Sequence, residues 1–140
     1  MQEWWTAPAE AEDGRLIMVS GRNDVEKFRS KPKFSIRIEI DWVYDDSAKA
    51  GMPDDETAKI MEQATDNMSN ILEKNKVAIM TGIFTGAGVR TWVFYTLSTN
   101  LFQNRLNEAL ASLPLLPLKI SAENDPEWLA YEEMKTFEIM

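Results

Sequence analysis

The sequence predicts a single α+β domain, and three observations support this prediction. Residues 34–44 alternate between apolar and polar side chains, which is typical of a strand with one buried face. Residues 54–75 repeat apolar side chains at three- and four-residue steps, as an amphipathic helix does. A glycine-rich turn at 86–88 joins two further strands. With a second helix and a last strand, residues 34–123 read strand, helix, strand, strand, helix, strand, the order of a ferredoxin-like βαββαβ sandwich.

The N-terminal residues predict an added β-hairpin. Two extended segments, Glu3–Glu10 and Arg15–Arg22, flank an Asp13-Gly14 pair, which tolerates the positive φ of a tight hairpin turn. Pro8 lies inside the first segment and indicates an edge strand, because proline donates no ladder hydrogen bond. Residues 23–30 are expected to form a short helical turn.

The strand at 34–44 has the clearest pattern of the core. The apolar parity comprises Phe34, Ile36, Ile38, Ile40, Trp42 and Tyr44, and the polar parity comprises Ser35, Arg37, Glu39 and Asp41. Successive side chains of a strand point to opposite faces, so we expect one buried and one more polar face.

The rest of the core follows from helix and strand signals. A helix is expected over 54–75, because the acidic residues at 54–56 are favourable at a helix N-terminus, where the positive end of the helix dipole lies. Asn100 is a candidate N-cap for a second helix through Ser112. The remaining core strands are expected at 77–85, 89–98 and 118–123.

The C-terminal residues 124–140 predict an added helix. Asp125 is a natural N-cap, and Pro126 suits the first helical position. No linker or internal repeat interrupts the chain. We therefore expect one domain over residues 1–140, with the hairpin and helical turn at 1–33, the core at 34–123 and the helix at 124–140.

The composition narrows the chemistry, because the 140 residues include no cysteine and no histidine. Disulfides are impossible, and the usual zinc ligands are missing. A cysteine nucleophile and a histidine base are likewise excluded. We expect no catalytic residues, no metal and no cofactor; any catalysis would depend on carboxylates, tyrosine, lysine or hydroxyl groups.

The charge and hydropathy exclude further classes. The net charge is −8, which repels phosphate backbones, so we expect no nucleic-acid partner. No apolar run is long enough for a transmembrane helix, and no basic leader precedes an apolar segment, so we expect a cytoplasmic protein. The glycines near 82–88 lead into a strand without a Walker lysine, which is typical of a hairpin turn and not of a phosphate loop.

The five tryptophans provide the candidate site. Trp42 lies on the apolar parity of its strand and is expected in the core. Trp92 has the other parity in its own strand, and we assign it to the second face of the sheet. The side chains expected on that face are Arg37, Met80, Arg90, Trp92 and Phe94.

Two interpretations of this face compete. Either Trp128 and Tyr131 of the last helix, or the hairpin tryptophans, cover the face in a second small core, or the face is open and binds a ligand. We expect coverage, because the terminal elements carry apolar residues that need burial. An intermediate arrangement leaves a groove between the last helix and the sheet, lined by Trp92, Trp128 and Tyr131 with Arg90 at its rim. The candidate ligand-binding residues are Arg37, Arg90, Trp92, Trp128 and Tyr131.

Several segments, in order, resemble a known family. Trp4-Trp5 precedes a hairpin, and Gly51-Met52-Pro53 begins a helix. An aromatic strand over 90–95 and a closing Asp-Pro-x-Trp-x-x-Tyr segment over 125–131 follow. Together these resemble the bacterial domain-of-unknown-function family six-nine-five over nearly the whole chain. That family has no established activity. Members appear fused to or alongside domains similar to the B-type regulator of ribonuclease E, a small acidic ferredoxin-like inhibitor, which implies an analogy of fold and charge and carries over no functional residue.

The leading functional expectation is a non-catalytic cytoplasmic module that binds or regulates another protein. The alternative is a small-molecule-binding domain or an enzyme that uses carboxylates and Arg90 in the groove between the sheet and the C-terminal helix. The sequence does not specify the oligomeric state.

Overall fold

The computed structural model describes residues 3–45 and 51–138 and places strands and helices in one mixed α+β fold. The elements are β1 (Trp4–Glu10), β2 (Leu16–Arg22), α1 (Glu26–Arg29), β3 (Ile36–Val43), α2 (Asp55–Lys74), β4 (Ala78–Gly86), β5 (Val89–Thr96), α3 (Thr99–Leu110), β6 (Leu118–Asn124) and α4 (Leu129–Lys135). The strands form a 6-stranded sheet in the order β1-β2-β4-β5-β3-β6. Every neighbouring pair is antiparallel.

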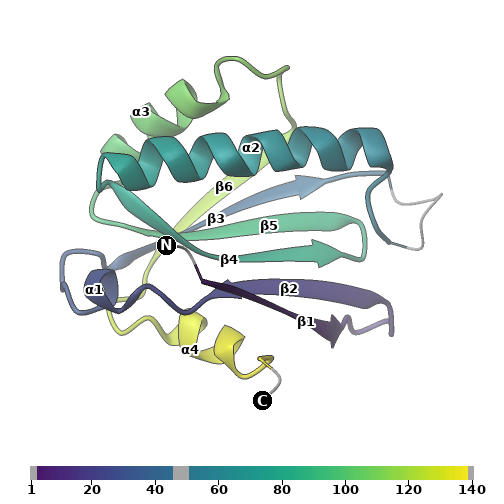
Figure 1. Ribbon diagram of the computed structural model, residues 1–140, viewed down its shortest axis with the longest axis horizontal. Helices are drawn as coiled ribbons and strands as arrows, with labels where there is room; N and C mark the ends of the chain where they lie inside the picture. Colours follow the sequence, from purple (N-terminus) through teal and green to yellow (C-terminus); the bar gives the residue numbers. More distant parts are fainter. Residues whose placement is uncertain (1–2, 46–50, 139–140) are drawn as a thin grey trace.

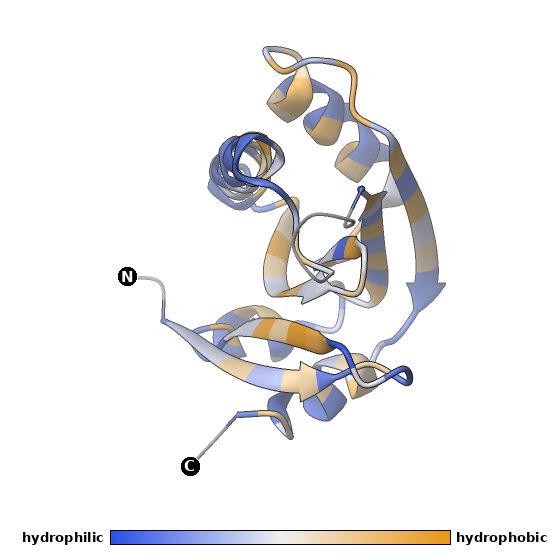
Figure 2. Cartoon of the chain, turned by 90° about the vertical axis from the view of Figure 1, so that its right-hand side faces the viewer, coloured by the Kyte–Doolittle hydropathy of each residue, from blue (hydrophilic) through white to orange (hydrophobic). Residues whose placement is uncertain are grey.

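Helices cover both faces of the sheet. Figure 1 shows α2 and α3 on one face, with α1 and α4 on the other, and Figure 2 shows the same layers from the side. Each face has its own apolar core. None of the helices in the described part of the chain combines the length and apolar character needed to cross a bilayer.

The long helix α2 follows its predicted pattern. The Asp54 carboxylate accepts a hydrogen bond from the Thr57 N–H at 2.7 Å and caps the helix. The stripe of side chains that α2 buries against the sheet comprises Met61, Ala64, Met68 and Leu72. Each of the larger side chains contributes about 1.5–3 kcal/mol through burial, so this stripe anchors α2 firmly.

Two predicted helix starts are wrong. Ser98, not Asn100, caps α3, because the Ser98 hydroxyl accepts from the Leu101 N–H at 3.2 Å. In α4 the capping position is Trp128, which has a left-handed backbone with φ of 56°. Asp125 still caps this helix, but from beyond a turn: its carboxylate accepts from the N–H groups of Leu129 and Ala130 at 2.8 and 3.1 Å.

The second sheet face is covered, as expected. Trp128, Tyr131 and Met134 of α4 are buried there. Residues from the sheet, the first helical region and its flanks complete this second core; they are Val19, Val25, Phe34, Ile79 and Tyr95.

The predicted grouping of Arg90 and Trp92 on that face is wrong. In the β3–β5 register Ile40 lies opposite Trp92, and Trp42 lies opposite Arg90. Directly opposite residues of antiparallel strands share a face, so both side chains lie on the α2 side. Met80 and Phe94 are buried in the same core. Parity within one strand does not determine the face until the register with its neighbour is known.

Candidate functional site

Two of the predicted ligand-binding residues hold α4 against the sheet. The Trp128 ring stacks on Tyr95 with centroids 4.1 Å apart, and its Nε1 donates to the Phe34 carbonyl at 2.7 Å. The Tyr131 hydroxyl donates to the carbonyl of Arg22 at 2.6 Å. Both side chains are buried and use their polar groups within the fold, so their role here is structural.

Arg37 is the third predicted residue on this face, and it lies in a cluster of carboxylates. Its guanidinium is 3.0 Å from Glu39 and 3.6 Å from Asp125, and it also pairs with Glu123. The buried Asp125 carboxylate accepts a hydrogen bond of 2.6 Å from the Tyr95 hydroxyl. Burial raises the pKa of Tyr95, and the Asp125 hydrogen bond adds to that shift. Burial opposes the charge on Asp125, but its hydrogen bonds and Arg37 outweigh this and lower its pKa.

Arg90 and Trp92 form a separate pair on the α2 side. The Arg90 guanidinium lies over the Trp92 ring, 5.7 Å from its centroid, and its Nε donates to the Thr85 hydroxyl at 2.9 Å. Burial lowers the pKa of Arg90. The Trp92 Nε1 donates to the Thr65 hydroxyl at 2.8 Å. The five predicted residues are thus divided between the two faces of the sheet and do not form one site.

A groove does lie between α4 and the sheet, with a volume of about 210 Å³. Of the predicted residues only Tyr131 lines it, and Arg90 is on the opposite face. The lining is Glu39, Thr81, Phe84, Val93, Ala130, Tyr131, Glu133, Met134 and Phe137. Apart from Thr81 and the two glutamates this surface is apolar, and it carries no basic group to hold an anion.

Two strand glycines make room for α4. Gly21 and Gly82 lie opposite each other in β2 and β4. A Cβ on Gly21 would lie 2.4 Å from the Trp5 ring, and one on Gly82 would lie 2.3 Å from the Met134 sulfur. Glycine inside a strand often marks such a close approach, so the sequence did contain a signal that another element packs closely against these strands.

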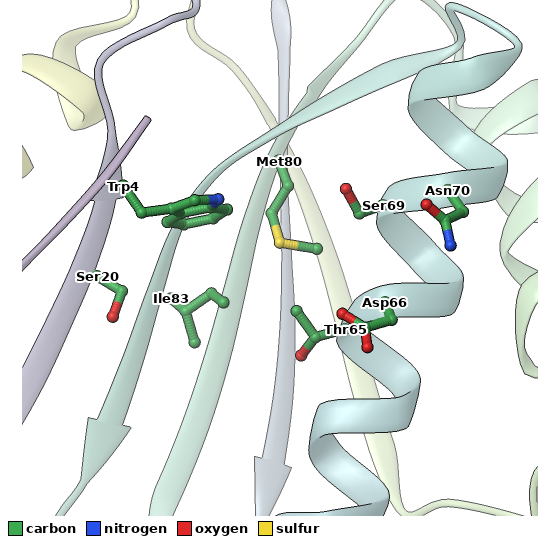
Figure 3. A pocket seen from close by; sticks show the side chains of 8 residues that line it. All are labelled: Trp4, Ser20, Thr65, Asp66, Ser69, Asn70, Met80 and Ile83. Carbon is green, nitrogen blue, oxygen red and sulfur yellow. The ribbon is translucent and has the colours of Figure 1, made fainter. Parts of the chain in front are cut away.

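A second hollow, which we call the α2 cleft, lies between α2 and the N-terminal hairpin. Its volume is about 250 Å³. Figure 3 shows the hairpin side chains on one wall, α2 side chains on the other, and β4 side chains between them. The lining residues are Trp4, Ser20, Thr65, Asp66, Ser69, Asn70, Met80 and Ile83.

The sequence of α2 explains why this wall is polar. Residues 65, 66, 69 and 70 lie beside the buried stripe, since neighbours in a helix surface recur at three- and four-residue steps. Because β1 and β2 extend the sheet beyond α2, this polar flank faces the hairpin (Figure 3). Trp92 donates a hydrogen bond to Thr65 of this flank, and Thr65 in turn donates to the Met61 carbonyl at 2.8 Å.

A buried ion cluster adjoins the α2 cleft, since its member Glu73 accepts a hydrogen bond from the hydroxyl of Ser69, which lines the cleft. Arg22, 3% exposed, donates to Glu73 of α2 at 2.7 and 2.8 Å and to Asp24 at 3.1 Å. The Arg22 guanidinium also lies 5.5 Å from the centre of the Trp4 ring. Burial opposes the charge on Asp24, but hydrogen bonds from Arg22 and the Glu3 N–H outweigh it and lower the pKa of Asp24. With one positive and two negative groups, the cluster carries a net negative charge.

The electrostatics of the α2 cleft favour a cation. Asp66 contributes an exposed carboxylate, and the lining described above contains no lysine or arginine. Trp4 is 36% exposed, and its indole already has the Arg22 guanidinium over it, so the exposed part of the ring is what a second cation can reach. An aromatic face and a carboxylate on facing walls are complementary to an organic cation. In residues 3–45 and 51–138 no three acidic side chains lie close enough together to hold a metal ion.

A family model matches residues 2–134 of the chain. The chain belongs to the family of unknown function DUF695. Neither the curated proteins nor the solved structures provide a match.

In this DUF695 protein the matched range includes both walls of the α2 cleft and most of α4. The segments that suggested the family have structural roles: Asp125, Trp128 and Tyr131 anchor α4, and the Gly51 carbonyl accepts a hydrogen bond from the Tyr44 hydroxyl at 2.6 Å.

Sequence reasoning missed most of the α2 cleft in this DUF695 protein. Trp4 was considered only as a possible cover for the sheet, and Asp66 was not singled out. One signal was present: short polar residues, not long charged ones, flank the buried stripe at 65–70. The facing wall could not be predicted, because it depends on pairing of β2 with β4 across more than sixty residues of chain.

Proposed function

We propose that this DUF695 protein is a non-catalytic cytoplasmic binding module whose α2 cleft receives an arginine or lysine side chain of a partner protein. The observation that carries the proposal is the exposed Trp4 indole on one wall and the Asp66 carboxylate on the other (Figure 3). The net charge of −8 also favours a basic partner. The absence of cysteine supports the cytoplasmic location.

The chemistry of the lining supports binding in preference to catalysis. Acid–base catalysis needs a proton donor and acceptor placed together, and covalent catalysis needs an activated nucleophile. Around Asp66 the lining offers hydroxyl groups, an amide and apolar side chains. These groups can accept hydrogen bonds from a guanidinium or ammonium group, and the partly exposed Ile83 offers an apolar surface to its aliphatic stem.

The expected affinity for a single side chain is low. A cation–π contact at an exposed site contributes about 0.5–1 kcal/mol, and a charge-assisted hydrogen bond about 1.5–3 kcal/mol. Together these contacts contribute about 2–4 kcal/mol, so an isolated arginine analogue is expected to bind with a dissociation constant of about 1–30 mM. A partner protein would add contacts around the cleft.

We also propose that β3 to β6, with α2 and α3, form a ferredoxin-like unit. The order β4-β5-β3-β6, the antiparallel neighbours and the position of both helices on one face support this assignment. The hairpin then extends the unit by two strands, and that extension builds one wall of the α2 cleft.

Isothermal titration calorimetry with arginine amide tests the binding proposal, with citrulline amide as the uncharged probe of nearly the same shape. We expect arginine amide to bind and citrulline amide to bind about 3- to 30-fold more weakly, because it loses both the cation–π contact and the ion pair. Asp66→Asn removes the ion pair alone and should weaken arginine amide binding by up to about fivefold. Glu56→Gln removes one negative charge from the exposed first turn of the same helix and should leave binding unchanged. Equal binding of the two probes, or no effect of Asp66→Asn, would refute the proposal.

A further inference from the structure

The edge strand β6 has an uncovered face and an unpaired side. Within the described residues it ends the sheet and pairs only with β3. Residues 119–124 are all exposed, and Ile120 is 48% exposed although its side chain is apolar. The opposite edge strand, β1, contains Pro8, a residue that hinders pairing, whereas β6 contains no proline. An edge of this kind is a surface on which another strand can pair.

The hydrogen bonds between β3 and β6 determine which groups of the edge point outward. The Asp125 N–H donates to the Ser35 carbonyl at 2.7 Å, in the same register that pairs Ile36 with Asn124. Hydrogen-bonded and non-hydrogen-bonded pairs alternate along antiparallel strands. Residues 119, 121 and 123 therefore direct their backbone groups toward β3, and residues 120, 122 and 124 direct theirs away from the sheet.

The sequence of β6 is complementary to itself in one antiparallel register. Consider a two-fold axis perpendicular to the sheet at Ser121. Lys119 of one copy then lies opposite Glu123 of the other, and Ile120 lies opposite Ala122. The outward N–H and C=O groups of Ile120 and Ala122 then face their counterparts in the second copy, as a hydrogen-bonded pair requires.

The charges on the neighbouring strand extend this match. In each copy Arg37 lies opposite Glu123 and pairs with it, and Asp41 lies opposite Lys119. A line of charged side chains therefore crosses the four strands of the interface. It runs from Arg37 and Glu123 of one copy to Lys119 and Asp41 of the other, and the sign of the charge alternates along it. A shift of the register by two residues in one direction places Lys119 opposite Ser121 and removes both intermolecular charge pairs. The same shift in the other direction places Lys119 opposite Asp125, whose buried carboxylate already accepts hydrogen bonds from Tyr95, Leu129 and Ala130.

The apolar side of β6 is equally suited to a second copy. A hollow of about 240 Å³ lies between α3 and β6, and Ile120 and Ala122 line it together with Phe102 and Leu106. In the two-fold arrangement these strand residues from the two copies meet between the two α3 helices. Exposed apolar area is thereby removed from water, which favours association.

We propose that β6 pairs antiparallel with β6 of a second copy of this chain, with the two-fold axis at Ser121, so that the two sheets become continuous. The proposal is independent of the α2 cleft, which lies on other elements. The expected assembly has twice the chain mass of 16.0 kDa.

Sedimentation velocity on paired charge variants tests this interface. Lys119→Glu places two glutamates opposite each other at both ends of the interface, and Glu123→Lys places two lysines there. Because two attractive pairs become repulsive, each variant alone should dissociate at about thirtyfold higher protein concentration than the wild type. An equimolar mixture restores opposite charges at both positions, so it should sediment as a dimer. Any loss of stability that a substitution causes within its own chain is unchanged by mixing, so recovery of the dimer in the mixture reports on the interface alone.

Two further variants complete the test. Ile120→Pro removes an outward donor and leaves the β3 ladder intact, so it should give a folded monomer, as circular dichroism would verify. Lys31→Glu changes the charge equally at an exposed position outside β3 and β6 and should remain dimeric. A wild-type monomer at about 100 μM, a dimeric Lys119→Glu variant, or a mixture that stays monomeric would each overturn the proposal.

Discussion

The Asp125 carboxylate is the central polar anchor of α4, and its removal should destabilise the protein strongly. Asp125 is 5% exposed and accepts hydrogen bonds from the Tyr95 hydroxyl and from the N–H groups of Leu129 and Ala130. In Asp125→Ala all three donors lose their acceptor. Arg37 retains its pairs with other carboxylates.

The magnitude follows from these contacts. Loss of a helix cap costs about 1 kcal/mol. A buried hydroxyl without an acceptor costs about 1–3 kcal/mol. Asp125→Ala should therefore lower the free energy of unfolding by about 3 kcal/mol. Tyr95→Phe should lower it by about 1 kcal/mol, because the Asp125 carboxylate keeps its other donors.

Urea unfolding followed by circular dichroism measures both values and their coupling. In the double variant the Tyr95 hydroxyl is already absent, so the two effects should fall short of additivity by about 1 kcal/mol or more. Asp66→Ala, at an exposed position of α2, is the control and should change stability by less than about 0.5 kcal/mol. A loss below about 1 kcal/mol for Asp125→Ala, or strict additivity with Tyr95→Phe, would refute this account of how α4 is held.

Three further predictions concern the pH dependence of stability, the Arg22 ion cluster and the contact between Gly82 and Met134. The pKa values of Asp24 and Asp125 are lower in the folded state than in the unfolded state. The stability that these carboxylates contribute is therefore complete above about pH 4 and is lost as the pH falls through their folded pKa values. Asp125→Ala should make the free energy of unfolding depend less steeply on pH in this acidic range. Arg22→Ala leaves Glu73 and Asp24 largely buried without their cation, and chemical denaturation should report a loss of about 3 kcal/mol, whereas a loss below 1 kcal/mol would contradict a structural ion cluster. Gly82→Ala should cost about 1–3 kcal/mol through its contact with Met134 and clearly less in a Met134→Ala background; an equal cost in both backgrounds would show that the glycine is not the seat of α4.

The sequence predicted the elements better than their mutual positions. Local patterns were sufficient for the hairpin, the alternating strand and the amphipathic α2, because periodicity and capping residues act within a few residues. The side on which Trp92 lies was predicted wrongly, since it depends on the register between β3 and β5, and nothing in either strand alone specifies that register. The start of α4 was also wrong, because Asp125 caps the helix across an intervening turn.

The same distinction separates the expected site from the one found. Burial of Trp128 and Tyr131 was correctly anticipated from the need to cover a sheet face. The α2 cleft arises where the added hairpin extends the sheet past the edge of α2, and this is a property of the assembled fold. Individual side chains such as Asp66 look like ordinary exposed helix residues in the sequence.

The most direct test of the binding proposal is an NMR titration that follows the indole N–H signals of the five tryptophans, each assigned by substitution. Trp4 lines the α2 cleft, Trp92 donates to Thr65 beneath it, and Trp128 is buried below α4. Addition of arginine amide should shift the Trp4 signal most and the Trp92 signal less, and leave Trp128 unchanged. A shift confined to Trp128, or no shift at about 50 mM probe, would contradict the assignment of the α2 cleft as the binding site.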